Sequence, residues 1–594
     1  MKNHQGKSKY ANTNVLGKMI KLTVESSFAV AMMAAPSTAG GLSFTPVGTY
    51  ETGVFDESAA RITAFDPDSE RLFVVNDDTV TLDVLDISDI SNPEELFNIE
   101  LTEYGYFGGV NSVAYSDGIF AVAVENDTIT NPGEVLFFNP YGHLLDRLTV
   151  GALPDSLAFT ADGSKLLVAN EGEPNSYNQP DSFDPEGSVS IIDMSDLSVK
   201  TAGFEAFNDK VHELKAEGVR IFGPNATVAQ DLEPEDIAFS EDGTTAYVTL
   251  QENNALGILD LTTGEFTDIV ALRFKNHSLP GNGIDGSDED GKVNIENYPV
   301  FGIYQPDEIA SYTVGGKTYL VTANEGDSRD YDGFNEETEV ADEQLDASAF
   351  PNAEELQKDE VIGRLEITNT MGDTDGDGDF DELYAFGGRS FSIWEYDDRE
   401  GKLDLVFDSG DEFEQITAEL FPDDFNSNND ENQSFDNRSD NKGPEPEGVA
   451  IGQMGNRTLA FIGLERIGGF MTYDVSNPLA PKFMSYTNNR DFSVEFDLDD
   501  EGDPDPTGEQ LTAVGDLGPE GLTFISAEDS PNDIALLVVA NEVSGTTTIY
   551  EMDSMPEIDS VPEPGTIFGL LAFGAAGKLF LKRKSKTTQE QEKA

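Results

Sequence analysis

The stretch DTDGDGDFDE, residues 373–382, places six acidic side chains in ten positions with glycines between them. Carboxylates this close repel one another by about 3 kcal/mol per pair at an effective dielectric near 20, so a folded loop of this kind needs a counter-ion. Alternating aspartates followed by glycine match the first half of an EF-hand loop, but the twelfth position is Tyr384 instead of glutamate. We predict a structural calcium site, with an unliganded turn as the alternative. Its candidate ligands are Asp373, Asp375, Asp377, Asp379, Asp381 and Glu382.

A second group of carboxylates recurs along the chain, where short apolar segments begin with Pro-Asp, Pro-Glu or a similar pair. Each such segment is followed by another that ends in Asn-Glu or a similar pair, as in KLLVANE at 165–171. If the two segments are antiparallel strands, the start of one lies beside the end of the other. The carboxylates gathered in this way are Asp155, Glu235, Asp307, Glu447, Glu520, Glu171, Glu325 and Glu542. They predict an oxygen-rich site for a metal, or for a metal with a phosphate, and solvated strand caps are the alternative.

The elements that must position these carboxylates are short strands. The paired segments occur seven times, and further apolar strands such as SVSIIDM and GFMTYDV follow them without helical periodicity. Four short strands per unit, separated by turn residues, are typical of a β-propeller blade. We therefore predict an all-β fold over residues 43–553, a seven-bladed β-propeller. The first strand of each blade would line a central channel, and the eight carboxylates would meet at its mouth.

The order of the predicted strands indicates how the ring closes and where its insertions lie. The last unit lacks a fourth strand, whereas SFTPVGTYE at 43–51 precedes the first unit, so we expect this N-terminal strand to complete the last blade. SFSIWEYD and KLDLVFDSG would be the outer strands of the fifth blade, which places the acidic loop in an insertion; an eighth blade after that loop is the alternative. Long loops on a rigid scaffold often bind ligands, although the composition of FPDDFNSNNDENQSFDNRSDNK favours a solvated loop.

The composition limits the partners of the chain. Its 35 Lys and Arg against 114 Asp and Glu give a formal charge of -79, which repels nucleic acid and attracts cations. Hydrophobic residues make up 38% of the chain, enough for a large core. There is no cysteine, which excludes disulfides and thiol catalysis. The four histidines are scattered and form no zinc-binding or triad pattern.

Both ends of the chain carry segments with the features of targeting signals. Residues 1–39 combine several lysines, an apolar run and small residues before a cleavage position, as in a secretory signal peptide. Residues 554–565 form a linker that contains the tetrad VPEP, and residues 566–594 combine a short apolar helix with a basic tail. The basic tail favours a cytoplasmic end for a membrane-spanning helix. A plain tail anchor is the alternative to a processed signal.

Several long motifs carry a family resemblance. LPDSLAFTADGSKLLVANEGEPN, the run from GKVNIENYPVFGIYQPDEIAS to TYLVTANEGDSRDY, and DTDGDGDFDELYAFGGRSFSIWEYD resemble the choice-of-anchor I family, which is related to the animal mesenchyme-specific cell-surface glycoprotein. The C-terminal order of tetrad, helix and basic tail resembles a PEP-CTERM sorting signal. The resemblance implies an exosortase-type transpeptidase as partner, passage through the inner membrane and delivery to the cell envelope or surface. Some relatives are labelled alkaline phosphatases, which implies calcium and phosphate chemistry.

Two functions are consistent with these patterns. The first is an exported, calcium-binding, envelope-anchored propeller that binds an extracellular polymer or another ligand. The alternative is a calcium-dependent phosphatase, in which metals at the channel mouth activate water and neutralise phosphate. No serine or threonine lies in a recognisable phosphatase motif, so no catalytic residue is predicted.

Overall fold

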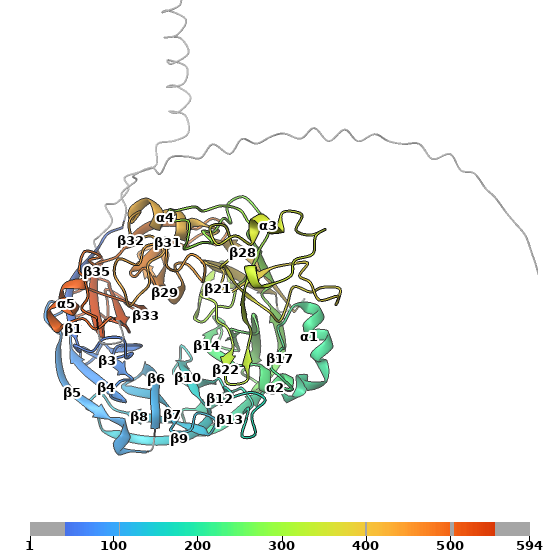
Figure 1. Cartoon of the computed structure of the whole chain (residues 1–594). Coiled ribbons are helices and arrows are strands. Elements are labelled where there is room, and N and C mark those ends of the chain that lie inside the picture. The colour runs from blue at the N-terminus through green and yellow to red at the C-terminus, as the bar shows by residue number, and fades with distance from the viewer. Residues whose placement is uncertain (1–41, 106, 398–400, 499–503, 553–594) are drawn as a thin grey trace, which may run out of the picture. The chain divides into compact units, whose positions relative to one another are not determined.

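The computed structural model describes residues 42–105, 107–397, 401–498 and 504–552. Seven four-stranded antiparallel sheets stand around one axis (Figure 1). The first strands of neighbouring sheets contact one another in turn, and the first strand of the seventh sheet contacts that of the first, so the ring is closed. The prediction of a seven-bladed β-propeller is confirmed.

The blades follow the chain in order. Blade 1 contains β2 (Thr63–Asp66), β3 (Arg71–Asn76), β4 (Thr81–Asp86) and β5 (Glu94–Glu100), and blade 2 contains β6 (Phe107–Ser116), β7 (Ile119–Asn126), β8 (Pro132–Phe138) and β9 (Leu144–Ala152). Blade 3 contains β10 (Pro154–Phe159), β11 (Lys165–Asn170), β12 (Ser188–Asp193) and β13 (Ser198–Gly203), and blade 4 contains β14 (Pro234–Phe239), β15 (Thr245–Leu250), β16 (Ala255–Asp260) and β17 (Glu265–Ala271).

Blades 5 and 7 depart from simple sequence order, and blade 6 follows it. Blade 5 contains β20 (Ile309–Val314), β21 (Lys317–Asn324), β27 (Ser390–Asp397) and β28 (Lys402–Asp408), and blade 6 contains β29 (Pro446–Met454), β30 (Arg457–Leu464), β31 (Phe470–Asp474) and β32 (Lys482–Thr487). Blade 7 contains β33 (Pro519–Ile525), β34 (Leu536–Asn541), β35 (Thr546–Met552) and the N-terminal strand β1 (Phe44–Glu51).

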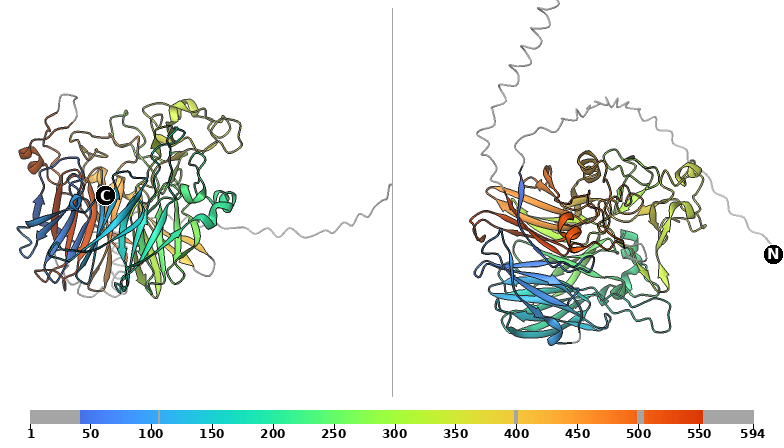
Figure 2. Two further views of the ribbon diagram at one scale, coloured as in Figure 1. Left: turned by 90° about the horizontal axis from the view of Figure 1, so that it is seen from below. Right: turned by 60° about the vertical axis from the view of Figure 1, so that its left-hand side comes forward.

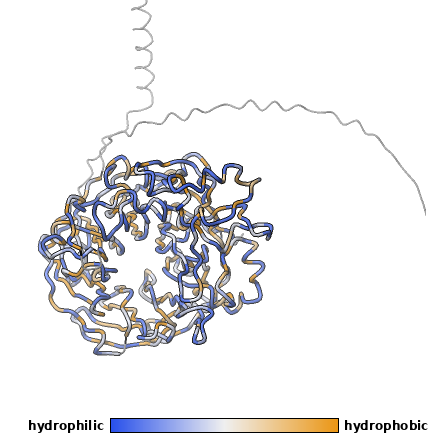
Figure 3. The backbone as a smooth tube through the Cα atoms, in the orientation of Figure 1, coloured by the Kyte–Doolittle hydropathy of each residue, from blue (hydrophilic) through white to orange (hydrophobic). Residues whose placement is uncertain are grey.

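The blades bury most of each middle strand and expose much of their outer strands. All six residues of the middle strand β34 are buried, whereas four of the six residues of the outer strand β13 are exposed. Apolar side chains from adjacent blades pack between the sheets, as where the rings of Phe73 and Phe120 stack. Apolar segments accordingly concentrate in the strands, and the outer loops are hydrophilic (Figure 3).

The expected closure of the ring by the N-terminal strand is present. β1 pairs antiparallel with β35, from Phe44 opposite Met552 to Glu51 opposite Thr546. The Phe44 side chain is 9% exposed, and its ring meets those of Phe461 and Phe470 of blade 6 edge to face, at 5.9 and 5.1 Å between centroids. β1 therefore covers an edge that β35 would otherwise expose.

The residues after the acidic loop do not form an eighth blade. They form β27 and β28, and the insertion lies between β21 and β27, as expected. The insertion also shares a five-stranded sheet with the segment before blade 5, and this sheet was not predicted. Its strands are, in spatial order, β18 (Phe274–Asn276), β19 (Phe301–Ile303), β26 (Tyr384–Ala385), β25 (Glu366–Thr368) and β24 (Glu337–Glu339). A separate apolar cluster around Ile284, Val340 and Leu365 packs with it.

The remaining elements are short and occur in the connections. They are the hairpin β22 (Asp330–Tyr331) and β23 (Phe334–Asn335), the 3-10 turns η1 (Leu101–Glu103), η2 (Glu205–Lys210) and η3 (Val340–Asp342), and the helices α1 (Val211–Glu217), α2 (Val228–Asp231), α3 (Ala353–Leu356), α4 (Glu412–Leu420) and α5 (Gly508–Val514). Seen from the side, the insertion and most of the helices project from one face of the ring (Figure 2). We call this the axial face, because the first strands begin there.

The Asn/Asp-rich segment between α4 and β29 is not the solvated loop that its composition favours. Asn426, Ser427, Asn429 and Ser439 are all buried. Asn426 donates to Ser439 and Ser427 donates to the carbonyl of Asp424 within the segment, and Asn429 donates to Glu465 of another loop. Asparagine and serine can satisfy buried main-chain and side-chain groups, so this segment is a polar core and not a coil.

Three predicted segments lie outside the described residues: the signal peptide at 1–39, the linker at 554–565 and the apolar helix with its basic tail at 566–594. Within the described ranges, no helix is long and apolar enough to cross a membrane.

The closure of the ring can be tested by Phe44→Ala in the full chain. Truncating a buried phenylalanine leaves a cavity at the junction of blades 6 and 7, and we expect a loss of about 3 kcal/mol in the free energy of unfolding. Leu96→Ala on β5, where the side chain is 42% exposed, is the matched control and should cost less than about 0.5 kcal/mol. Equal losses in urea-induced unfolding would contradict a role for β1 in closure.

Candidate functional site: carboxylates on the ring axis

The first strands carry acidic residues at one repeated backbone feature. The residue before proline has a left-handed backbone in four blades, at Leu153 (φ 46°), Gln305 (φ 43°), Glu445 (φ 51°) and Gly518 (φ 65°). The register shifts just after the proline in blades 3, 4, 6 and 7, within β10, β14, β29 and β33. Such bulges redirect a side chain out of the alternation of a strand. In these four blades the acidic residue after the proline lies in the bulge, where it can turn toward the axis.

We call the eight predicted side chains the axial carboxylates: Asp155, Glu171, Glu235, Asp307, Glu325, Glu447, Glu520 and Glu542. The structure places six of them in two triads, each with carboxylate oxygens within 4.8 Å of one another. The first triad is Asp155, Glu171 and Glu235, from blades 3 and 4, and the second triad is Asp307, Glu325 and Glu447, from blades 5 and 6. Glu520 instead forms an ion pair of 2.8 Å with Arg61, and Glu542 accepts a hydrogen bond from Ser58.

The first triad has almost no compensating positive charge. Burial raises the pKa of Asp155 to about 6, with Glu520 adding to it and Arg61 opposing it. Burial and neighbouring carboxylates raise the pKa of Glu171 and Glu235 well above the usual range, and no cation acts strongly on either. Glu252 adds to this charge: it is 2% exposed, and its Oε2 has no hydrogen-bond partner among the described residues.

A cluster of cations lies beside one member of the second triad, Glu325. Lys442 Nζ lies 3.0 Å from Glu325 Oε1 and 2.5 Å from an oxygen of Glu445. Arg438 and Arg466 also pair with Glu445, at 2.9 and 2.8 Å. Burial opposes the ionisation of Glu445, but the three cations outweigh it and hold its pKa well below the ordinary value. This buried glutamate therefore anchors a cationic cluster beside the second triad.

Sequence reasoning missed Glu445 and its counterpart Glu233, although a pattern was present. Blades 4 and 6 both begin with Glu-Pro-Glu, at 233–235 and 445–447. In both, the first glutamate is fully buried against arginine, Glu233 with Arg329 and Glu445 with Arg438 and Arg466. The second glutamate belongs to a triad. In each Glu-Pro-Glu repeat, the first glutamate therefore forms a structural ion pair, and the second is one of the axial carboxylates.

The asparagines at the ends of the second strands do not join the axial set. Asn170 donates to the hydroxyls of Ser188 and Ser190 on β12, and Asn324 donates to those of Ser390 and Ser392 on β27. Both asparagines are completely buried. They hold neighbouring strands together, and only the glutamate after each of them, Glu171 or Glu325, reaches the axial set.

The acidic loop folds back on itself. The main-chain N–H groups of Gly376 and Gly378 donate to Asp373, and Thr374 donates to Asp381. Asp373, Asp375 and Asp381 bring one oxygen each within 4.8 Å of one another, and so do Asp346, Asp379 and Asp381.

Two of the predicted ligands lie outside these groups. Asp377 accepts from the N–H of Asp379, and Glu382 accepts from the Tyr384 hydroxyl. Asp346 was not predicted, because only the bridge between Leu345 and Phe380 brings it to the loop.

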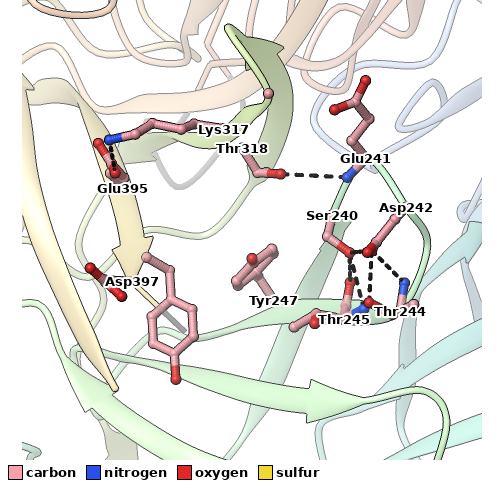
Figure 4. Close-up of a pocket in the computed structure, with 12 residues that line it drawn as sticks. Ser240, Glu241, Asp242, Thr244, Thr245, Tyr247, Lys317, Thr318, Glu395 and Asp397 are labelled. Carbon is pink, nitrogen blue, oxygen red and sulfur yellow. Dashed lines mark hydrogen bonds and ion pairs between the residues drawn. The ribbon is translucent and has the colours of Figure 1, made fainter. Parts of the chain in front are cut away.

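A cavity of about 640 Å³ lies at the opposite face of the ring, between the turns of blades 4 and 5 (Figure 4). Its wall includes Ser240, Asp242, Thr245 and Lys317, and the serine and threonine hydroxyls there bond to Asp242 or to main chain. These are turn-stabilising bonds, so the cavity shows no convergent chemistry.

The sequence comparison identifies the family. The choice-of-anchor I domain matches residues 61–478. The chain belongs to the choice-of-anchor I family. A PEP-CTERM protein-sorting motif matches residues 560–584. This choice-of-anchor I protein is therefore exported and associated with the cell surface or envelope, and an exosortase, the enzyme that generally processes this motif, is its expected partner.

Curated relatives of this family member are animal proteins. Gigasin-3a of Magallana gigas is 28% identical over 213 residues, 35% of this chain and 70% of Gigasin-3a. The mesenchyme-specific cell surface glycoprotein of Strongylocentrotus purpuratus is 28% identical over 288 residues, 43% of this chain. That alignment spans 36% of the sea urchin protein, little more than a third of its length.

Solved structures similar to this choice-of-anchor I protein share little sequence with it. Hydrazine synthase of Kuenenia stuttgartiensis is 12% identical with a TM-score of 0.42, over 85% of this chain and 100% of that one. The Cps50 (Swd1) β-propeller domain of Myceliophteria thermophila is 7% identical with a TM-score of 0.41, over 86% and 99%.

The axial carboxylates predict how stability depends on pH without calcium. The pKa values of Asp155 and Glu542 are raised to about 6 and about 7, so the native state holds protons that the unfolded chain releases above about pH 4. The free energy of unfolding in a chelator should therefore fall as pH rises from about 4 to about 7. Urea unfolding at several pH values measures this slope, which Asp155→Asn with Glu542→Gln should reduce. A rise in stability over this range would contradict the prediction.

The acidic loop is tested separately by Asp375→Asn. The negative charge of Asp377 raises the pKa of Asp375, so the substitution should leave the calcium-free unfolding midpoint unchanged or higher. Calcium that binds only the folded loop raises the midpoint of the wild type. We expect the variant to lose part of that rise, and Asp146→Asn, an exposed carboxylate on β9, to retain all of it. An identical calcium response in all three proteins would mean that the loop holds no ion.

Proposed function

We propose that this protein is an envelope propeller that binds calcium at the first triad and uses the axial face to hold an anionic extracellular polymer. The observation that carries the proposal is the first triad itself: three carboxylates from two blades whose oxygens lie within 4.8 Å of one another. Calcium prefers six to eight oxygen ligands, including carboxylates, in flexible geometries. A divalent cation would remove the repulsion that burial concentrates there.

The first triad supports cation binding better than the second. Lys442 pairs directly with Glu325 of the second triad, so part of that charge is neutralised by the protein. At the first triad, Arg61 acts on Asp155 but is itself paired with Glu520. The unpartnered oxygen of Glu252 adds a further candidate ligand beside Glu171 and Glu235.

The chemistry of the ligand follows from what lies beside the triads. A small cavity of about 200 Å³ is lined by Arg438, Lys442, Arg466 and Ser328, together with acidic groups. A calcium ion on one side and these cations on the other would both attract carboxylate or phosphate groups. Acidic polysaccharides and other polyanions carry such groups in repeated form, which suits a protein delivered to the envelope.

The acidic loop would hold a second, structural calcium ion. The two sets of three carboxylates in this loop share Asp381, and one set includes Asp346 of a separate segment. An ion there would fix the insertion without contacting a ligand on the axis.

A calcium-dependent phosphatase is the second candidate function. The observation that favours it is the cationic cluster of Arg438, Lys442 and Arg466 beside the carboxylates, since metals with adjacent cations can neutralise a phosphoryl group. No nucleophile is assigned.

The test uses the full chain and Glu171→Gln with Glu235→Gln. We expect the wild type to bind at least one more calcium ion per chain than this variant, measured by equilibrium dialysis, and to bind alginate only in the presence of calcium. Glu241→Gln, exposed at the opposite face, is the control and should behave as wild type.

The outcomes separate the two functions. Equal calcium content in wild type and variant would overturn the first triad as the site. Calcium-dependent hydrolysis of p-nitrophenyl phosphate that the variant loses, without alginate binding, would favour the phosphatase.

A further inference from the structure

Two loops meet on the flank of the insertion, away from the two triads and from the acidic loop. One is the segment between β18 and β19, closed by a bridge from Ile284 to Glu296 and containing Asp285 and Asp290. The other is the polar segment between α4 and β29, which contains Asn426 and Asp436. The first loop has no place in the proposed function, and the second enters it only through Arg438 and Lys442.

A chain of hydrogen bonds brings the two loops together through Glu414 of α4. Its Oε2 accepts from the N–H of Asp285 at 3.0 Å, and its Oε1 accepts from Asn426 Nδ2 at 3.3 Å. Asn426 Nδ2 also donates to Ser439, whose hydroxyl donates to Asp436 Oδ1 at 2.7 Å. Asp285, Asn426 and Asp436 are therefore linked through Glu414 and Ser439.

Each of these three residues keeps one oxygen without a partner. Asp285 and Asp436 are 1% exposed, and Asn426 is fully buried. Asp285 Oδ1, Asp436 Oδ2 and Asn426 Oδ1 have no hydrogen-bond partner in the part of the chain that the structure describes. Buried polar atoms are nearly always paired, and an unpaired one costs free energy. Three such oxygens on residues of one hydrogen-bonded group indicate a missing positive partner.

The cations nearby, Arg389 and Lys292, already have partners and contact none of the three oxygens. Arg389 pairs with Glu414 and gives its other donors to the carbonyls of Asp285, Ser439 and Asn441. Lys292 pairs with Asp290 but is 60% exposed. The net charge around the three oxygens is therefore negative, and burial with the charges of Glu414, Asp436 and Asp290 raises the pKa of Asp285 to about 7.

We propose that Asp285, Asp436 and Asn426 bind a divalent cation of the calcium class between the two loops. All the candidate ligand atoms are oxygens, as such an ion prefers. Asp288-Glu289-Asp290-Gly291 also has the D-x-D-G spacing of Asp375-Gly376-Asp377-Gly378 in the acidic loop, with a left-handed glycine at the end of both.

The ion would act as a clamp. The polar loop that it fixes continues into Arg438, Lys442 and Glu445, the cationic cluster beside the second triad. Calcium at this clamp would therefore set the position of groups on the axial face without contacting a ligand there.

The experiment compares the full wild-type chain with Asp436→Asn, which is isosteric and keeps the side-chain oxygen that Ser439 contacts. We expect Asp436→Asn to bind one calcium ion fewer per chain, measured by mass spectrometry of metal content at fixed free calcium. Glu289→Gln removes an exposed charge from the same loop and should retain the ion. Equal calcium content in wild type and Asp436→Asn would overturn the proposal.

Hydrogen exchange of the wild type gives a second readout that needs no variant. Calcium should slow exchange in both residues 285–296 and 425–441, and Glu171→Gln with Glu235→Gln should keep this protection because it alters only the first triad. Exchange in these two segments that does not respond to calcium would contradict the clamp, whatever happens at the axis.

Discussion

Closing seven blades into a ring forces the starts of seven strands onto one axis, and in this protein most of those starts are acidic. The repulsion that results is the constraint on which the rest of the structure depends. Like charges in a partly dehydrated site can be relieved by protons, by fixed cations or by bound ions. The raised pKa values of Asp155 and Glu542 favour bound protons, and the Arg61–Glu520 pair is an example of a fixed cation.

Fixed cations come from the connections and not from the blades. Arg329 lies in the insertion of blade 5 and pairs with Glu233, while Arg438 and Lys442 lie in the polar loop before blade 6. Removing one partner of a buried pair leaves an uncompensated charge, which is strongly destabilising. The long connections are therefore part of the electrostatic balance of the ring, and their folded state depends on the carboxylates that they neutralise.

The features that could be predicted from the sequence are those that depend on local residue patterns. Strand alternation, repeated Pro-acid pairs and the unpaired strand at 43–51 were enough for seven blades, their closure and the axial carboxylates. The five-stranded sheet was not predictable, because β19 pairs in parallel with β26 across more than eighty residues. Asp346 and the burial of Asn426 were missed for the same reason: both depend on contacts between distant segments that no local periodicity records.

Blade 7 joins the first described strand, β1, to the last three, β33 to β35. During synthesis, β1 emerges before any other part of the ring and β35 emerges last. The ring consequently cannot close until the entire domain has been made, and β1 has no partner in its own blade throughout that interval. Synthesis thus imposes a waiting period on folding, in which an exposed edge invites association with other chains.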